Sequence, residues 1–274
     1  MGSEHAVTSI VDAGIYAEGR RVATATTFAE TFGYLDEHPE SFAWIGMKRP
    51  THKDVDVLAQ QFELSPLLIE DIINAHQRPK FERYGAVGFL VLRAATYRDT
   101  SETIEFGEVH ALVGDRFIVT LRHSPTPDLS ELRRELQAKP KVLAKGPRVV
   151  LTRLLDTVVD GYRPVMLGIE NDVDEIETEV FGGASHVSKR IYQLSREVID
   201  LQRALRPLRQ IVDDLRDDPI MNNAPNCCAS SCATSRTTRS ASTSASSRCT
   251  RRSRARSTST WRCRRSGRTR RSPT

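Results

Sequence analysis

The feature that most constrains this chain is an abrupt change in composition after Asp218. The 274 residues include 35 acidic side chains, and not one of them follows that position. Of the 40 basic residues, 13 are arginines between Arg236 and Arg271, so the first 218 residues carry 27 basic and 35 acidic groups. A segment rich in Ser, Thr and Arg with few apolar side chains cannot bury a core. We therefore expect residues 222–274 to be disordered and the fold to lie within residues 1–221.

The cysteines follow the same division, because all five lie in the tail. Cys228 and Cys232 have a spacing found in zinc sites, but no histidine follows them and a second pair is missing, so we do not predict a metal there. A cysteine-free body fits a reducing cytoplasm. No secretory signal opens the sequence, and nowhere do about eighteen apolar residues run together, as a membrane-spanning helix requires.

Residues 1–146 show short apolar runs divided by turn residues and interleaved with helical patterns. The pattern is typical of an α/β domain, and we expect a mixed sheet with helices on its faces. A hairpin turn is predicted at Gly114-Asp115. Strands are predicted at 42–47, 86–97, 105–113 and 117–121, and helices at 28–37, 53–62 and 66–75, the last with Ser65 as its cap.

Residues 147–221 are predicted to form a long antiparallel helical hairpin, the start of a stalk. Apolar residues recur at spacings of three and four from Leu151 to Val180, and Gly182-Gly183 ends the run. A second helix follows with a heptad seam that indicates a partner helix in the same chain, with association with another subunit as a further possibility, and Pro207 predicts a kink in it. The seam consists of Val187, Ile191, Leu194, Val198, Leu201, Leu205, Leu208, Val212 and Leu215.

The end of the first helix is strongly acidic, with six carboxylates between Glu170 and Glu179. Such a run is typical of a solvated helix face, and weak screening of a cation is the competing interpretation. No catalytic signature is present, neither a nucleophile elbow, nor a phosphate-binding glycine loop, nor a zinc-binding His-Glu helix, so we do not predict an enzyme.

Five stretches in order resemble the CorA family of magnesium and cobalt transporters. The most specific is Ile-Glu-Asp-Ile-Ile-Asn-Ala-His-Gln-Arg-Pro-Lys at 69–80. The others are Ala-Thr-Tyr-Arg-Asp at 95–99, Ile-Val-Thr-Leu-Arg-His at 118–123, Glu-Val-Phe at 179–181 and Leu-Arg-Pro-Leu-Arg at 205–209. The resemblance covers roughly residues 9–218. His76, inside the first stretch, is expected to be a hydrogen-bonded structural residue, because Mg²⁺ prefers oxygen ligands.

The resemblance implies a homopentamer in the cell membrane, with this domain on the cytoplasmic face and two membrane spans joined by a loop that contains a Gly-Met-Asn motif. Neither the spans nor that motif occur in this sequence, so the chain as written is expected to be cytoplasmic and unable to transport. The resemblance also implies regulatory Mg²⁺, with Co²⁺ as the alternative ion, between neighbouring subunits. The positions that match are Asp71 and Asp217, with Glu70 and Asp218 adjacent.

The arginine-rich tail has two interpretations. It could be a basic arm that binds a polyanion such as RNA, or the product of a one-base slip in the reading frame. The residues 232–238 can be spelled TGC GCG ACG TCG AGG ACC ACG; read one base earlier after a C, the same bases encode Leu-Arg-Asp-Val-Glu-Asp-His, which is similar to the family at this point. We favour the slip, and nucleic acid is not the expected partner. Two further hypotheses stay open: a soluble divalent-cation sensor or scaffold, and a nucleic-acid-binding adaptor.

Overall fold

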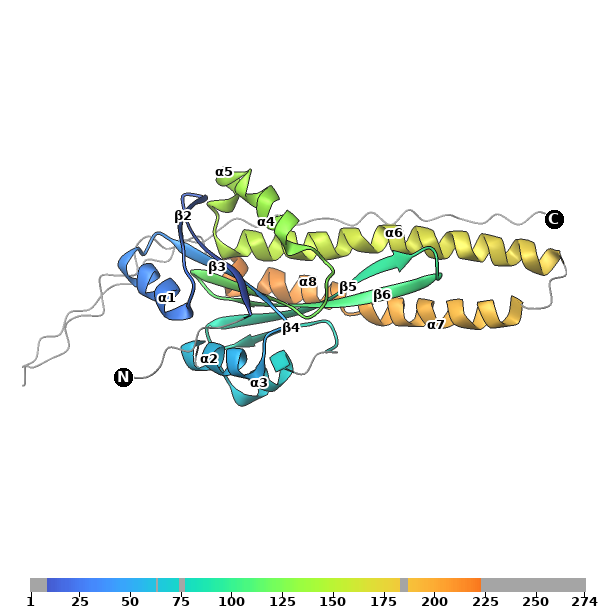
Figure 1. The fold of residues 1–274 in the computed structure, drawn as a ribbon, viewed down its shortest axis with the longest axis horizontal. Helices are drawn as coiled ribbons and strands as arrows, with labels where there is room; N and C mark the ends of the chain where they lie inside the picture. The colour runs from blue at the N-terminus through green and yellow to red at the C-terminus, as the bar shows by residue number, and fades with distance from the viewer. Residues whose placement is uncertain (1–8, 63, 74–76, 183–186, 223–274) are drawn as a thin grey trace, which may run out of the picture. The chain divides into compact units, whose positions relative to one another are not determined.

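The computed structural model describes residues 9–62, 64–73, 77–182 and 187–222. A seven-stranded sheet in the order β2-β1-β3-β7-β6-β5-β4 lies between two groups of helices (Figure 1). Only β3 and β7 pair in parallel, and the other neighbours are antiparallel, so the predicted mixed sheet is confirmed. The strands are β1 Ile10–Ala17, β2 Arg20–Thr24, β3 Phe42–Lys48, β4 Lys80–Tyr84, β5 Val87–Arg98, β6 Thr103–Val113 and β7 Phe117–Arg122.

The helices divide between the two faces of the sheet. One core cluster joins the sheet to α1 Phe28–Glu37, α2 His52–Phe62 and α3 Pro66–Ile73. The other joins it to the later helices, which are α4 Leu129–Gln137, α5 Pro140–Leu143, α6 Pro147–Phe181, α7 Val187–Leu205, α8 Leu208–Asp217 and α9 Pro219–Asn222. Strand β3 shows why both faces are filled: Phe42 and Trp44 belong to the second cluster, whereas Ala43 and Ile45 belong to the first, as the two-residue period of a strand requires.

Helix α6 lies against β5, and two contacts fix its position. The Tyr162 hydroxyl donates a hydrogen bond to the Arg93 carbonyl oxygen. One turn and a half further on, Gly168 lets the helix approach the ring of Tyr97, since a Cβ built on this glycine would stand 2.4 Å from a ring carbon. The backbone of α6 therefore lies directly on the sheet at this point, and a larger residue would not fit.

The predicted helical hairpin is present, because Arg190 at the start of α7 pairs with Glu175 and Glu179 near the end of α6. The predicted kink at Pro207 is a complete break: α7 ends at Leu205 and α8 begins at Leu208. The hairpin at Gly114-Asp115 joins β6 to β7 as expected. The seam divides into an inner row, with Val187, Leu201 and Leu215 buried, and an outer row that includes the exposed Ile191 and Val212.

Six elements were not predicted: β1, β2, β4, α4, α5 and the four-residue α9. Strands β2 and β4 are the two edges of the sheet, and charged residues interrupt both, two of five in β2 and three of five in β4, so neither shows an apolar run. A two-residue turn at Glu18 and Gly19, both with positive φ, joins β1 to β2. The domain boundaries at 146/147 and 221/222 remain predictions, and the expected disorder of the tail concerns residues outside those described.

Candidate metal-binding site

Glu70 and Asp71 lie on α3, which is a short helix with one buried side. The Ser65 hydroxyl accepts a hydrogen bond from the backbone N–H of Leu68 at 3.3 Å, which caps the first turn as predicted. Leu68 and Ile72 are fully buried against the sheet. The two carboxylates lie on the other side of the helix, where Glu70 is exposed and Asp71 is half-buried.

Asp71 already has a cation beside it. The Lys80 Nζ lies 2.6 Å from Asp71 Oδ2 and 2.9 Å from Glu82 Oε2, and the Tyr84 hydroxyl donates to the same Glu82 oxygen at 2.6 Å. Burial lowers the pKa of Lys80, but its hydrogen bonds to the two carboxylates outweigh this, and the net shift is upward. Lys80 therefore stays charged and neutralises Asp71. A metal ion at Asp71 has to displace this ammonium group.

Asp217 and Asp218 end α8, and their environments differ. Asp217 is exposed. Asp218 is only 6% exposed; its Oδ1 accepts hydrogen bonds from Arg83 Nη1 at 2.8 Å and from the Ile220 backbone N–H at 2.7 Å. Asp218 thus ties the end of α8 to β4 and caps α9. Of the two, Asp217 is the carboxylate that solvent and a metal ion can reach.

Strand β4 separates the two groups of carboxylates. Lys80, which pairs with Asp71, and Arg83, which pairs with Asp218, point to opposite faces of this edge strand, because they are an odd number of residues apart. Helices α3 and α8 accordingly belong to different core clusters. The fold of one chain does not bring Asp71 and Asp217 to one site. His76 lies outside the described residues, so its expected structural role stays a prediction.

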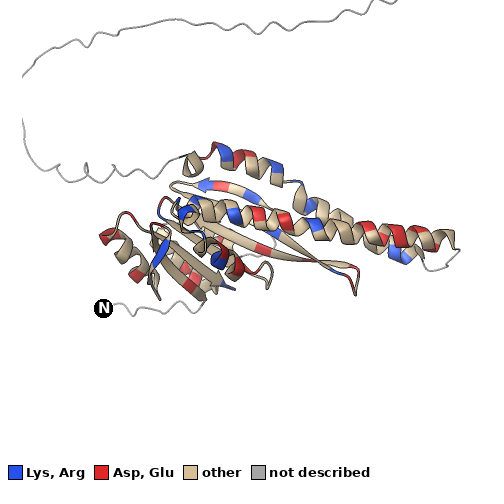
Figure 2. Ribbon diagram, turned by 90° about the horizontal axis from the view of Figure 1, so that it is seen from above, with Lys and Arg blue, Asp and Glu red and all other residues tan. Residues whose placement is uncertain are grey.

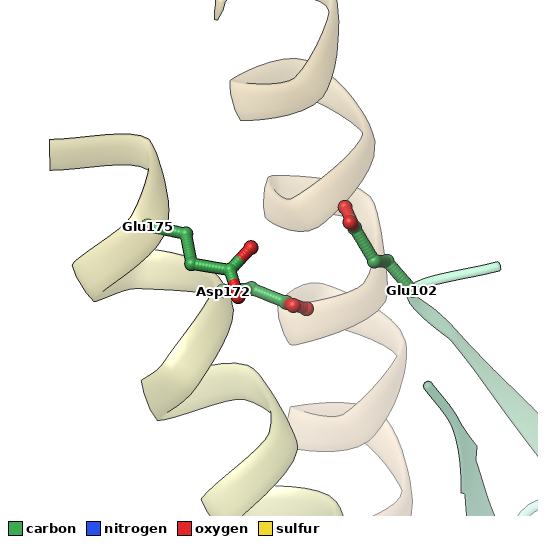
Figure 3. A group of neighbouring side chains, drawn as sticks. All are labelled: Glu102, Asp172 and Glu175. Carbon is green, nitrogen blue, oxygen red and sulfur yellow. The ribbon is translucent and has the colours of Figure 1, made fainter. Parts of the chain in front are cut away.

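A second group of carboxylates lies where α6 passes the β5–β6 turn. Glu102, Asp172 and Glu175 each offer an oxygen within 4.8 Å of the others (Figure 3). Arg190 of α7 lies between them: its Nε is 2.8 Å from Glu102, its Nη2 is 2.5 Å from Glu175, and its Nη1 is 2.9 Å from Glu179. These bonds, first that to Glu175, raise the pKa of Arg190. A guanidinium group occupies the position that a cation would take.

Asp172 is the buried member of this group, and it is 5% exposed. Burial raises its pKa above the ordinary value, although the Tyr97 hydroxyl donates a hydrogen bond to Asp172 Oδ2 at 2.6 Å and has the opposite effect. The sequence interpretation noted the acidic run on α6, yet the contributions of Glu102 and Arg190 were missed. Those residues are separated by 88 positions, and only the packing of the hairpin on the β5–β6 turn brings them together.

The chemistry of the predicted residues suits a hard divalent cation, since carboxylate oxygens are what Mg²⁺ prefers. Glu70 and Asp217 are exposed enough to exchange water for such an ion. Within the ranges that the structure describes, no helix combines the length and the apolar character that crossing a bilayer requires.

Comparison with known proteins decides the family. The family described as CorA-like Mg²⁺ transporter protein matches residues 39–229, more than two thirds of the chain. The chain belongs to this family. The resemblance read from the five sequence stretches is thereby confirmed, and the family is one of transporters rather than enzymes.

Individual CorA relatives agree with this. The YfjQ protein of Bacillus subtilis is 33% identical over 182 residues, which are 66% of this chain and 54% of that protein. The cobalt/magnesium transport protein CorA of Thermotoga maritima is 27% identical over 180 residues, 64% of this chain and 51% of that protein. The chain spans about half the length of the curated relatives that it matches.

Solved structures confirm the predicted fold class. The soluble domain of CorA from Methanocaldococcus jannaschii superposes with a TM-score of 0.60 at 14% identity, covering 77% of this chain and 82% of that one. Full-length CmaX gives 0.62 at 20% identity, covering 81% and 69% respectively. At these identities the likeness concerns the fold alone, which is that of CorA soluble domains.

Proposed function

We propose that this chain is the Mg²⁺-sensing, cytoplasmic-face part of a CorA-like divalent-cation transporter that assembles as a homopentamer in the cell membrane. In this proposal Mg²⁺, or Co²⁺ in its place, binds between Asp71 of one subunit and Asp217 of the next, with Glu70 and Asp218 adjacent. The observation that carries it is that edge strand β4 holds Asp71 through Lys80 on one face and Asp218, the neighbour of Asp217, through Arg83 on the other. A single chain cannot complete the site, whereas two neighbouring copies can.

The local charges suggest how the ion would be exchanged. Lys80 contacts both Asp71 and Glu82, so Glu82 can retain the ammonium group when a metal ion takes Asp71. Mg²⁺ keeps most of its water and needs only one or two carboxylates, which fits an exposed site of this kind. When the site is occupied, the ion holds two acidic surfaces together; when it is empty, these surfaces repel each other and the assembly loosens.

Calorimetry on the full chain tests the site. We expect Mg²⁺ binding that weakens by about tenfold or more in Asp71→Asn and in Asp217→Asn, since each change removes one of the carboxylate ligands. The matched control is Asp36→Asn, because the Asp36 side chain is 81% exposed on α1 and has no place in the proposed site. Binding that is equally tight in the variant carrying both Asn substitutions would refute the ion clamp.

The proposal also includes the loss of transport activity in the chain as written. The family match extends only to residue 229, and we propose that a one-base slip near there replaces the helix that leads to the pore, so that this product does not transport. Sequencing the gene across codons 215 to 230 tests this, and an unshifted frame would leave the basic-arm interpretation standing. Rescue of Mg²⁺ uptake by the chain as written would contradict it directly. Both interpretations of the tail concern residues outside those described.

A further inference from the structure

Helix α6 exposes a row of apolar side chains at a spacing of seven, here called the α6 stripe: Val159, Met166, Val173 and Val180. Each is between 40% and 50% exposed. Every seventh residue of a helix returns to within about 20° of the same direction, so the four form one continuous stripe. The carboxylates that face α7, Glu175 and Glu179, lie on a different side of the helix. Helix α7 of the same chain therefore does not cover the stripe.

Acidic residues border this stripe. Glu170 and Glu177, also seven apart, are exposed beside it, and so is Asp174. Acidic residues are frequent along this end of the long helix, as the red segments of Figure 2 show. A surface of this kind repels nucleic acid and anionic lipid, whose charge has the same sign. It fits an apolar helix face with a basic border.

Helix α7 carries such a face, directed away from the hairpin core. Its apolar members are Tyr192, 63% exposed, and Ile199, 47% exposed, again seven apart. Basic residues recur beside them at the same spacing, namely Lys189, Arg196 and Arg203. Two of these basic residues contact other side chains of α7 at the protein surface. Arg196 lies 6.0 Å from the centre of the Tyr192 ring, and Arg203 forms an ion pair with Asp200 at 2.9 Å. Contacts of this type are weak, so these groups remain available to a partner.

The charged residues of the two faces also lie at matching positions along the axis of the hairpin. Arg190 pairs with Glu175 and Glu179, which fixes the antiparallel register. Since both helices rise equally per residue, Arg196 lies about level with residue 171 of α6 and Arg203 about level with residue 164. A second copy placed alongside, with its hairpin in the same direction, thus brings Lys189 and Arg196 level with Glu177 and Glu170.

We propose that the α6 stripe binds the outer face of α7 of a second copy of this chain. The contact is heterologous, because two different surfaces meet, so each added copy leaves one face of each kind open until a ring closes. The stripe contains no metal ligand, and this association is independent of the proposed ion clamp.

Sedimentation velocity of the full chain in EDTA tests the contact. One variant reverses the α6 border, Glu170→Arg with Glu177→Arg; another reverses the α7 residues level with it, Lys189→Glu with Arg196→Glu; a third combines all four changes. Wild type is expected to associate as its concentration rises. Each reversal is expected to raise the protein concentration at which half of the chains are associated, the association midpoint, by about tenfold or more. The combination is expected to restore this midpoint, because opposite charges again face each other.

Two controls complete the design. Exposed charges on α4 reversed in the same way, Glu131→Arg with Arg134→Glu, should leave the midpoint unchanged. Asp217→Asn should leave it unchanged as well, which separates this contact from the ion clamp. Circular dichroism verifies that every variant retains its helices. A wild type that stays monomeric at all concentrations, or a combined variant as weak as either reversal alone, would overturn the proposal.

Discussion

At the scale of single residues, Arg190 is the side chain on which the tip of the hairpin depends. It contacts Glu102 on the β5–β6 turn and two carboxylates of α6, and its own side chain is only 18% exposed. Three separate elements therefore meet at one guanidinium group. A network of this kind contributes more than isolated surface pairs do, because one ordered side chain serves several partners.

Arg190→Gln is expected to lower the free energy of unfolding by about 1–2 kcal/mol, since it leaves the buried Asp172 beside carboxylates without a counter-charge. Millimolar Mg²⁺ should recover part of this loss in the variant, because Glu102, Asp172 and Glu175 can then share an ion. Urea unfolding with and without Mg²⁺ measures both effects. Lys189→Gln, a neighbouring charge outside the network, is the control and should change little.

Tyr162 provides a pH-dependent prediction. Burial raises the pKa of its phenol from 10.0 to about 12. The unfolded chain releases this proton near pH 10 while the folded chain keeps it, so unfolding releases a proton and the free energy of unfolding falls as pH rises from about 10 to 12.

Tyr162→Phe removes this dependence along with one hydrogen bond. Wild type should be more stable than the variant by about 1 kcal/mol at pH 8, and the gap should close by pH 11. Urea titrations at a series of pH values follow the gap. A constant difference across that range would show that the phenol does not titrate differently in the two states.

At the scale of elements, the contact of α6 with β5 can be tested at two glycines of one helix. A Cβ on Gly168 would stand 2.4 Å from the Tyr97 ring, whereas a Cβ on Gly161 would meet only the Ala95 carbonyl oxygen at 3.7 Å. Gly168→Ala should therefore destabilise the fold by about 1–3 kcal/mol in spite of the better helix propensity of alanine. Gly161→Ala should stabilise it by up to about 1 kcal/mol. Thermal or urea unfolding of the pair measures the contrast, and equal shifts would contradict the close approach.

Elements with an apolar period were predictable, and those without one were not. The helix at 28–37 has its predicted bounds, and β3, β5, β6 and β7 lie within two residues of theirs, because core-facing side chains alone specify them. Strand β4 was missed because its charged residues form ion pairs with distant partners rather than an apolar run.

The same distinction applies to the site. The positions of Asp71 and Asp217 came from the family resemblance. The anchoring of Asp218 by Arg83, 135 residues away, could not be predicted from local pattern.

At the scale of the whole molecule, the described core residues and those packed against them all lie between Ile10 and Met221. Deletion of residues 223–274 is therefore expected to leave the free energy of unfolding unchanged within about 0.5 kcal/mol, as for surface changes away from structural features. Urea unfolding of the two chains tests this. A loss of several kcal/mol on deletion would show that the basic segment contributes to the fold.

Edge strand β4 links two ion pairs that lie on opposite faces of the sheet. Lys80 and Arg83 share a backbone of five residues, and each holds the carboxylate of a different helix on a different side of the sheet. A displacement of the end of α8 would be transmitted by the Arg83–Asp218 ion pair to this strand. Rotation of the strand would then move Lys80 relative to Asp71. The edge strand would thus couple the two faces of the sheet, so that metal binding on one face would change the position of the charged groups on the other.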